Sequence, residues 1–311
     1  MIESGSHTAG VSAEDFGLPP NTALRYEQPA AALRRHLPSY VVLDSENVGP
    51  SGTAEWMLPS WAQIWVVITD RPITVRIGSR RYDPVSSAIL YGVTSRAMPV
   101  LAHGGVTIGI DVSPLGWARF FSRSAETLRD RITPLADIMP PAAVNELVAR
   151  LHGSDRALEV KQVLDDFFLR HLPDPNPDEP IVAEIMRLIV DDETLDLSVA
   201  AAGLGIDIRT LRRLSKRYFG FPPRMLMMRT RFLRSFLAML GKGGRADYSL
   251  VGPDYHDLSH FTRDAKRFLG MTPRQFMAMD TPYLEAALRA RNLVFGVPTP
   301  SLDRSGSDTD G

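Results

Sequence analysis

Short apolar runs alternate with clusters of Gly, Pro and Asp between residues 40 and 112. The runs are four to seven residues long and rich in Val, Ile and aromatic side chains, which is typical of β-strands. The intervening clusters, for example residues 49–52 and 103–105, favour turns. Several strands at this spacing predict a barrel or a sandwich. The predicted strands begin at Tyr40, Ala62, Ile73, Ser87 and Val106.

After residue 115 the apolar residues recur at helical spacing instead. Helices are predicted at 125–131, 142–151 and 158–172, and they could pack against the strands. The stretch at 173–180 is rich in Pro and acidic residues, which is typical of a solvated, semi-rigid linker.

The two ends of the chain differ in composition from its interior. Residues 1–38 are rich in Ala, Pro and polar residues, and we expect them to be loosely ordered. Residues 298–311 are rich in Ser, Asp and Gly, so we expect this tail to be disordered.

Another pattern occurs twice near the C-terminal end, at residues 207–224 and 257–274. Each copy begins with an Asp, which can accept hydrogen bonds from the free N–H groups of a helix start. Each then continues as an amphipathic helix to a Gly that can end it, and to a Pro that fits the first turn of the next helix. The copies share seven of eighteen positions, namely Asp207/Asp257, Arg213/Arg263, Lys216/Lys266, Arg217/Arg267, Gly220/Gly270, Pro223/Pro273 and Arg224/Arg274.

Each of these two predicted helices has an apolar face and a polar, mainly basic face. Leu211 and Tyr218 lie on the apolar face of the first copy, and Phe261, Ala265 and Phe268 on that of the second. The opposite faces carry Arg209, Arg212, Arg213, Lys216 and Arg217 in the first copy and Ser259, His260, Thr262, Arg263, Lys266 and Arg267 in the second.

The charge of this region departs from that of the whole chain. Residues 205–275 hold fifteen Arg or Lys against five acidic residues, a net charge of +10, whereas the whole chain carries −1. A basic segment on an otherwise acidic protein is typical of a module that binds phosphate groups. We therefore interpret the two helices as DNA-reading elements rather than as solvated surface helices.

The run DLSHFTRDAKRFLGMTPRQF in the second copy resembles the second helix-turn-helix of the AraC/XylS family of bacterial transcription regulators, and the first copy resembles that family's first unit. The resemblance covers roughly residues 180 to 280. It implies a long helix joining the two units, which residues 223–240 fit. It also implies recognition helices in successive major grooves, about 34 Å apart, on one side of the duplex.

The resemblance assigns roles to the polar face of each helix. Base edges would be contacted by Arg209, Thr210, Arg212 and Arg213 in the first unit and by Ser259, His260 and Arg263 in the second. Arg suits the O6/N7 edge of guanine, and Ser or Thr can serve several bases. His260 could instead pack on the turn. Phosphates would be contacted by Lys216, Arg217, Lys266 and Arg267.

The second unit departs from the family pattern ahead of its reading helix. Gly252 and Pro253 fall where a regular supporting helix is expected, and they would shorten or bend it. Residues 197–203, which precede the first reading helix, form an ordinary helical pattern. We expect the second reading helix to be present but held less firmly.

The strand region resembles the cupin-like sensor half of AraC-type regulators over about residues 20 to 125. The likeness is carried by the run from Tyr91 to Met98, the aliphatic strand at 106–112 and a helix that begins at Pro114. The predicted fold class is therefore α+β. It comprises a cupin-like β-barrel or sandwich, a helical linker and a C-terminal all-α domain with two helix-turn-helix units.

A small barrel can hold one ligand between its sheets. Candidate lining residues are Trp56, Trp61, Trp65, Tyr82 and Tyr91, although aromatic residues in strands are also common core residues. A metal-dependent cupin needs a His-x-His pair with an acid and another His, whereas His103 is the one histidine between residues 40 and 125. We thus expect no metal, no cofactor and no enzymatic activity. A cupin-type metal-dependent enzyme fused to a DNA-binding domain, and a regulator without a ligand, remain the alternatives.

The composition narrows the picture further. The chain has no cysteine, which excludes disulfides, thiolate metal sites and cysteine nucleophiles. No apolar run reaches the length of a membrane span and no signal segment is evident, so we expect a cytoplasmic protein.

The sequence thus predicts a sequence-specific DNA-binding transcription regulator, modulated by a small molecule or by dimerisation through its N-terminal domain. Its expected partner is double-stranded promoter DNA, with RNA polymerase, a small-molecule effector and a second copy of the chain as candidates. The predicted segments are 1–38 (loosely ordered), 39–125 (β domain), 126–172 (helical linker), 173–180 (Pro-rich linker), 181–282 (DNA-binding domain) and 298–311 (tail). The family resemblance makes the helices of 126–172 a candidate dimer interface, and packing against the strands is the alternative.

Overall fold

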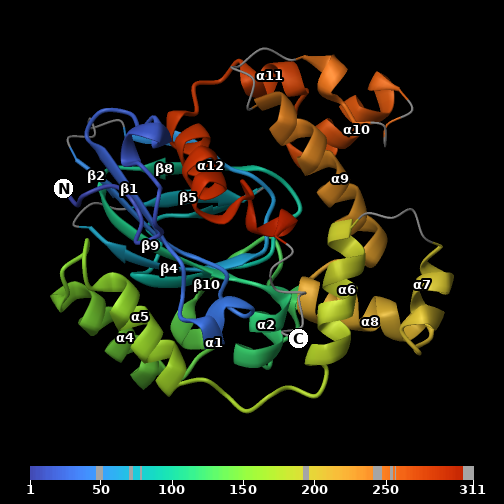
Figure 1. Ribbon diagram of the computed structural model, residues 1–311, viewed down its shortest axis with the longest axis horizontal. Coiled ribbons are helices and arrows are strands. Elements are labelled where there is room, and N and C mark those ends of the chain that lie inside the picture. Colours follow the sequence, from blue (N-terminus) through green and yellow to red (C-terminus); the bar gives the residue numbers. More distant parts are fainter. Residues whose placement is uncertain are drawn as a thin grey trace.

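Two antiparallel β-sheets face each other in the N-terminal half, and helices form the C-terminal half, as predicted (Figure 1). The computed structural model describes residues 1–46, 52–69, 73–77, 79–191, 196–240, 247–252, 255 and 257–303. The larger sheet has the strand order β1-β2-β9-β4-β7-β10 and the smaller one β3-β8-β5-β6. The strands are β1 (Thr22–Glu27), β2 (Tyr40–Ser45), β3 (Thr53–Met57), β4 (Ala62–Ile68), β5 (Thr74–Ile77), β6 (Arg80–Tyr82), β7 (Ala88–Tyr91), β8 (Met98–Ala102), β9 (Gly105–Val112) and β10 (Ile132–Pro134).

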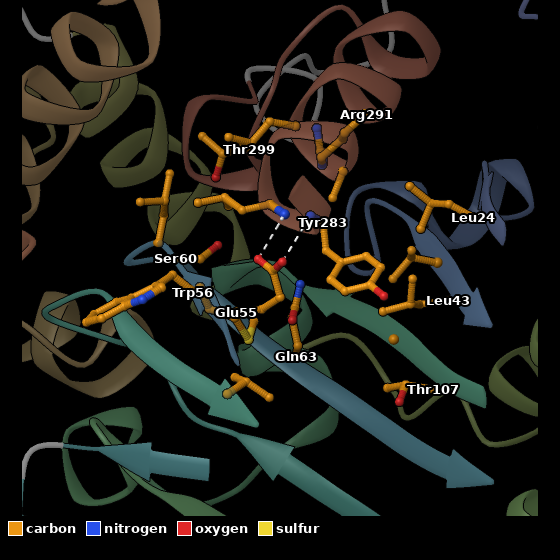
Figure 2. Close-up of a pocket in the computed structure, with 18 of the residues that line it drawn as sticks. Leu24, Leu43, Glu55, Trp56, Ser60, Gln63, Thr107, Tyr283, Arg291 and Thr299 are labelled. Atoms are coloured by element: carbon orange, nitrogen blue, oxygen red, sulfur yellow. Dashed lines mark hydrogen bonds between the residues drawn. The ribbon is translucent and has the colours of Figure 1, made fainter. Parts of the chain in front are cut away.

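Strands β4 and β9 are the longest and lie side by side in the larger sheet. Ile64 and Ile110 face each other in this pair and are buried, as expected for a strand covered on both faces. The same register places Gln63 opposite Asp111, two polar residues within otherwise apolar strands. The two sheets enclose a cavity at this position (Figure 2).

The prediction that residues 1–38 are loosely ordered is wrong. Strand β1 pairs with β2 along its whole length, and the Ile2 N–H donates to Asp44 at 2.8 Å. Leu24 and Tyr26 are buried, so this segment gains enough apolar contact to be fixed as the edge of the sheet. Two short helical segments lie on either side of β1, namely η1 (Ala13–Phe16) and α1 (Ala31–Arg34).

Helices follow the strands in the middle of the chain, as the apolar spacing predicts. Helices α4 and α5 lie on the side of the β domain opposite α12 (Pro282–Phe295), as Figure 1 shows. The segments are α2 (Pro114–Phe120), α3 (Ala125–Leu128), η2 (Leu135–Asp137), α4 (Pro141–Gly153) and α5 (Val160–Arg170).

The segment predicted as a solvated linker, 173–180, is mostly exposed, but its C-terminal part is fixed by contacts and begins helix α6 (Glu179–Asp191). Glu179 is buried and accepts hydrogen bonds from Arg119 of α2, at 2.5 Å from Nε and 2.7 Å from Nη2. Asp178 accepts a hydrogen bond from the hydroxyl of Tyr218 at 2.6 Å. Asp178 and Glu179 are therefore paired with a donor and a cation of neighbouring helices, which fixes the C-terminal part of the segment.

The C-terminal helices include no segment long and apolar enough to cross a membrane, within the part of the chain that the structure describes. They are α6 (Glu179–Asp191), α7 (Leu197–Gly203), α8 (Ile208–Phe219), α9 (Pro223–Leu240), η3 (Tyr248–Leu250), α10 (Leu258–Phe268), α11 (Pro273–Met277) and α12.

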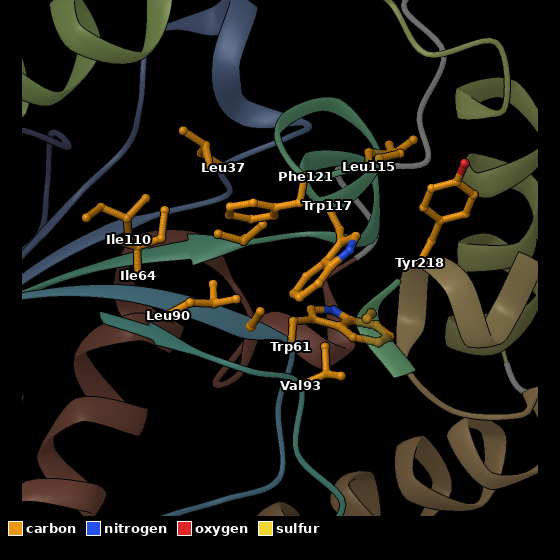
Figure 3. Close-up of a cluster of buried hydrophobic side chains, with 14 of the residues drawn as sticks. Leu37, Trp61, Ile64, Leu90, Val93, Ile110, Leu115, Trp117, Phe121 and Tyr218 are labelled. Atoms are coloured by element: carbon orange, nitrogen blue, oxygen red, sulfur yellow. The ribbon is translucent and has the colours of Figure 1, made fainter. Parts of the chain in front are cut away.

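One hydrophobic core runs from the β domain into the first C-terminal helices (Figure 3). Trp61, the residue just ahead of β4, packs edge-on against Phe219 of α8, with 5.7 Å between ring centroids. Gly220, which ends α8 with φ of 75°, lies so close to Val93 that an added Cβ would approach the valine at 2.3 Å. This glycine is required both by its left-handed backbone and by the close approach of the two halves.

The tail predicted to be disordered from residue 298 is fixed in its first part. Residues Pro300–Leu302 form the turn η4, Ser301 is fully buried, and the carbonyl of Pro300 accepts a hydrogen bond from Trp61 Nε1 at 3.0 Å. An indole N–H that is buried needs such an acceptor, which explains why this segment is held. Residues 304–311 lie outside the described residues.

Candidate nucleic-acid interface

Helix α8 presents the first predicted reading surface. Asp207 caps it by accepting a hydrogen bond from the Thr210 N–H at 2.6 Å, and this bond lowers the pKa of the Asp207 carboxyl. Leu211 and Tyr218 are buried as predicted, and the opposite side points outward. The side chains of Arg209, Arg212, Arg213 and Arg217 are exposed, and Thr210 and Lys216 are half-buried.

Helix α10 repeats this arrangement fifty residues later. The Asp257 carboxylate accepts a hydrogen bond from the His260 N–H at 2.7 Å, while Phe261 and Phe268 are buried on the inner face. The outer face exposes Ser259, Arg263, Lys266 and Arg267. The His260 ring lies edge-on to Tyr255, with 5.2 Å between centroids, so part of it is engaged in packing.

Helix α9 connects the two units and provides the core of the second. Phe232 is fully buried at its middle and stacks on Phe236 at 5.5 Å and on Phe268 of α10 at 5.4 Å. Phe261 adds a further contact at 5.6 Å. Because these rings span both helices, α10 has a fixed orientation relative to α9 (Figure 1).

Within the residues that the structure describes, the support ahead of α10 is a short turn. Where the first unit has the helix α7, the described residues of the second have the 3₁₀ turn η3. A buried polar group adds to the support, since Tyr255 donates a hydrogen bond from its hydroxyl to Asp264 at 3.0 Å and the Arg231 guanidinium lies 3.6 Å from the same carboxylate. Burial raises the pKa of the Tyr255 hydroxyl, which keeps it a donor. Pro253 lies outside the described residues.

The predicted phosphate-contacting residues have different surroundings. Lys266 and Arg267 are exposed on α10, with the Arg267 guanidinium 5.8 Å from the Phe268 ring centroid, and the Arg217 guanidinium lies 5.4 Å from that of Tyr218. Lys216 instead forms an ion pair at 3.0 Å with Glu126 of α3. One cation of the reading helix is thus engaged by a carboxylate from the other half of the molecule.

Arg229 of α9 fixes the connecting helix to the β domain, and the sequence alone does not single it out. The side chain is fully buried, and its Nη1 donates hydrogen bonds to the carbonyls of Ser60 at 3.2 Å and Thr94 at 3.0 Å. Its guanidinium also lies 4.6 Å from the centroid of the Trp61 ring. Burial lowers the pKa of this guanidinium because the charged form is removed from water.

The cavity of the β domain has a volume of about 250 Å³ and lies between the two sheets and helix α12 (Figure 2). Of the aromatic residues predicted to line a pocket, Trp56 and Trp65 form part of its wall. Tyr91 lies behind Trp65, stacked on it at 4.9 Å, and Tyr82 packs in the outer sheet. Trp61 belongs to the core between the two halves instead.

The polar residues of this cavity are absent from the predicted set. They include Glu55, Gln63, Asp111 and Arg291. Gln63 donates a hydrogen bond to Asp111 at 2.5 Å and accepts one from Trp65 Nε1 at 3.0 Å. The sequence could have indicated Gln63 and Asp111, because both are polar residues within otherwise apolar strands. No residue near Arg291 in the sequence indicates a contact with the β domain.

Comparison with known families identifies the helical half. A family model described as a helix-turn-helix domain matches residues 200–279, the segment that contains both capped basic helices. The chain carries an AraC-type helix-turn-helix domain. The AraC-type domain therefore includes α8, α9, α10 and α11, while α12 lies beyond the matched residues.

Several solved structures show some likeness to the chain. ToxT from Vibrio cholerae O395 is 13% identical, with a TM-score of 0.41 over 83% of this chain and 98% of that one. ToxT from Vibrio cholerae strain SCE256, bound to an unsaturated fatty acid, is 10% identical, with a TM-score of 0.40 over 84% of this chain and 96% of that one. The AraC-like transcriptional activator CuxR is 11% identical, with a TM-score of 0.27 over 69% and 86% of the two chains. Similarity at this level decides neither the fold nor the ligand of this chain. No curated protein sequence matches it.

Proposed function

We propose that this protein is a transcription regulator that binds specific promoter sequences through both helix-turn-helix units. The observation that carries the proposal is the pair of capped helices α8 and α10, which expose basic residues from a domain of the AraC type. Arg209, Thr210, Arg212 and Arg213 would contact bases in one major groove, and Ser259, His260 and Arg263 in the next. Lys216, Arg217, Lys266 and Arg267 would contact phosphates and make binding depend on salt.

The β domain would modulate this binding, through a small molecule or through dimerisation. Support comes from the contacts that join it to both units. Arg229 and Gly220 pack against the strands and loops of the β domain, and the Ala97 N–H donates to the Phe268 carbonyl at 2.6 Å. The cavity of the β domain favours a small molecule, because it offers a mostly apolar space between the two sheets and α12.

The test is recovery of genomic DNA fragments with the purified full chain at two salt concentrations. We expect a small set of fragments sharing two short motifs about one helical turn apart, retained at the higher salt. A single motif would indicate that only one unit reads sequence. Recovery without any motif, lost at moderate salt, would contradict the proposal and leave only a general DNA tether.

A further inference from the structure

Helix α12 closes the cavity of the β domain and is continuous with the second helix-turn-helix unit. It begins five residues after α11 ends and then crosses the open end of the two sheets (Figures 1 and 2). Leu284, Ala287, Leu288 and Arg291 of α12 line the cavity, opposite residues of β1 to β4 and β9. One wall of the cavity is thus formed by the chain that directly follows the DNA-binding domain.

This closure is made by specific contacts along the helix. At the start of α12, the N–H groups of Tyr283 and Leu284 donate to the Glu55 carboxylate of β3 at 3.1 and 3.4 Å. Further along, Arg289 Nη1 donates to the Phe16 carbonyl at 2.8 Å, and Phe295 packs edge-on against Tyr26. A carboxylate at a helix N-terminus is favoured by the helix dipole, so Glu55 links β3 to α12 directly.

Each charged group at the cavity wall has a partner. Arg291 Nε lies 3.8 Å from Asp111 and its Nη2 lies 3.4 Å from Asp303, while the charge of Glu55 meets the positive end of α12. Burial raises the pKa of both the Glu55 and Asp111 carboxyls. A charged ligand would enter this space without a free counter-charge, and burying an unpaired charge is costly. The cavity therefore fits a neutral molecule.

Two polar atoms of the lining lack a hydrogen-bond partner. Ser60 Oγ and Arg291 Nε are buried, and neither makes a hydrogen bond within the described part of the chain. A buried polar group without a partner costs about 1–3 kcal/mol. A hydroxyl or carbonyl oxygen on an otherwise apolar ligand would satisfy one of them.

The cavity wall packs directly against the second reading unit. Its link to the first unit is indirect, because the Pro300 carbonyl in the wall accepts a hydrogen bond from Trp61, which packs against Phe219 of α8. Trp56 of the wall packs edge-on against Phe276 of α11 at 5.6 Å, and Phe276 packs in turn against Phe236 of α9 at 5.4 Å. Leu58, also in the wall, belongs to the same apolar cluster as α10. The first unit meets the β domain at Trp61, Val93 and Glu126, and none of these is among the described residues that line the cavity.

We infer that the cavity binds a neutral, mostly apolar small molecule carrying a hydroxyl or carbonyl group, and that occupancy acts on the second helix-turn-helix unit through α12 and Trp56. This inference rests on the proposed function, because it names the ligand class and the route by which the β domain modulates DNA binding. The bound molecule fills the space beneath α12 and holds that helix, α11 and α10 in one arrangement.

The ligand class is tested with three fluorescent probes on one ring system: 9-anthracenemethanol (neutral), anthracene-9-carboxylate (anionic) and 9-(aminomethyl)anthracene (cationic). We expect saturable binding of the neutral probe to the full chain, at least about tenfold tighter than either charged probe. Ala287→Trp fills the cavity from α12 and should weaken neutral-probe binding at least about tenfold. Leu293→Trp on the exposed side of the same helix should leave it unchanged. Preference for a charged probe, or equal loss in both variants, overturns the assignment.

The route is tested by amide hydrogen exchange on the full chain without DNA, with and without 9-anthracenemethanol. We expect slower exchange in α10, α11 and α12 and no change in α8. Ala287→Trp should abolish the response. An equal change in α8, or none in α10 and α11 while the probe is bound, would contradict the route. Since no DNA is present, this result is independent of the fragment recovery, so failure of the inference and failure of the proposed function are distinguishable.

Discussion

The guanidinium of Arg229 lies 4.6 Å from the centroid of the Trp61 ring, and this contact joins the helix between the two reading units to the first long strand of the β domain. The same arginine donates to two loop carbonyls of that domain. A cation on an aromatic face contributes more when it is removed from water, as here. The contact therefore fixes the connecting helix, and with it the spacing of both units relative to the β domain.

Arg229→Ala should lower the free energy of unfolding by about 2–4 kcal/mol, because it opens a cavity and leaves the Ser60 and Thr94 carbonyls without their donor. The measurement is urea unfolding followed by tryptophan fluorescence. Arg224→Ala, which removes an exposed arginine from the same helix, is the matched control and should change the value by less than about 0.5 kcal/mol. Equal effects in both variants would contradict a special role of Arg229.

Arg209→Ala and Arg263→Ala should each weaken binding to a recovered operator by about 1–3 kcal/mol and relax the base preference at one position. Both side chains are exposed, Arg209 in the first turn of α8 and Arg263 in the second turn of α10. The measurement is a fluorescence-anisotropy titration against the operator and against single-base variants. Unchanged affinity in both mutants would remove the base-contact assignment.

Lys266→Ala should instead weaken binding to all sequences alike and reduce the slope of log affinity against log salt by about 1. The reason is that a phosphate contact releases counterions but carries no base information. The measurement is the affinity for the operator and for unrelated DNA, each at several salt concentrations. A loss confined to the operator would reassign Lys266 to base reading.

Glu126→Gln should raise DNA affinity by roughly twofold to fivefold at low salt, because it releases Lys216 for phosphate contact. The effect should shrink as salt is added, since this ion pair is partly exposed. Glu146→Gln, which changes the net charge equally on α4, is the control and should have no such effect. If both variants bind alike, Glu126 does not restrain Lys216.

Glu179→Gln should destabilise the protein at neutral pH by about 1–3 kcal/mol. Burial acts to raise the pKa of the Glu179 carboxyl, but hydrogen bonds from Arg119, the Asn176 N–H and His36 outweigh it and lower the pKa from 4.5 to about 2. Because the folded pKa lies below the unfolded value, the stabilisation is complete above about 4.5 and is lost as the pH falls toward about 2. The stability difference between wild type and variant, measured by urea unfolding, should therefore shrink over this range. A difference independent of pH would contradict the ion-pair role.

Local signals explain what the sequence predicts well. The caps, glycine stops and apolar faces of α8 and α10 each lie within one eighteen-residue unit, so Asp207, Gly220 and their counterparts define both helices without tertiary information. The central strands were likewise predicted from their own residues, as the ladder of β4 and β9 shows.

Contacts between segments that are distant in the sequence explain the features that the sequence does not predict. Glu55 and Tyr283 are 228 residues apart in sequence, and neither has a local feature that indicates the other. The same holds for Arg229 and Ser60, 169 residues apart. At both ends of the chain, composition predicts loose order although the structure is fixed. Leu24 and Ser301 have polar and Pro residues as sequence neighbours, yet both are buried against strands and helices from distant parts of the sequence.

Because both halves share the core at Gly220, the DNA-binding half cannot be exchanged as an independent unit. Cutting the chain ahead of α6 would expose the ring of Phe219 and remove the partner of every group that now meets Trp61 and Val93. Fusing these helices to a different N-terminal half would remove Val93, the side chain that now packs against Gly220. A functional chimaera would need the loop that contains Val93 together with the helices. In this protein the suitable fusion point therefore lies inside the β domain.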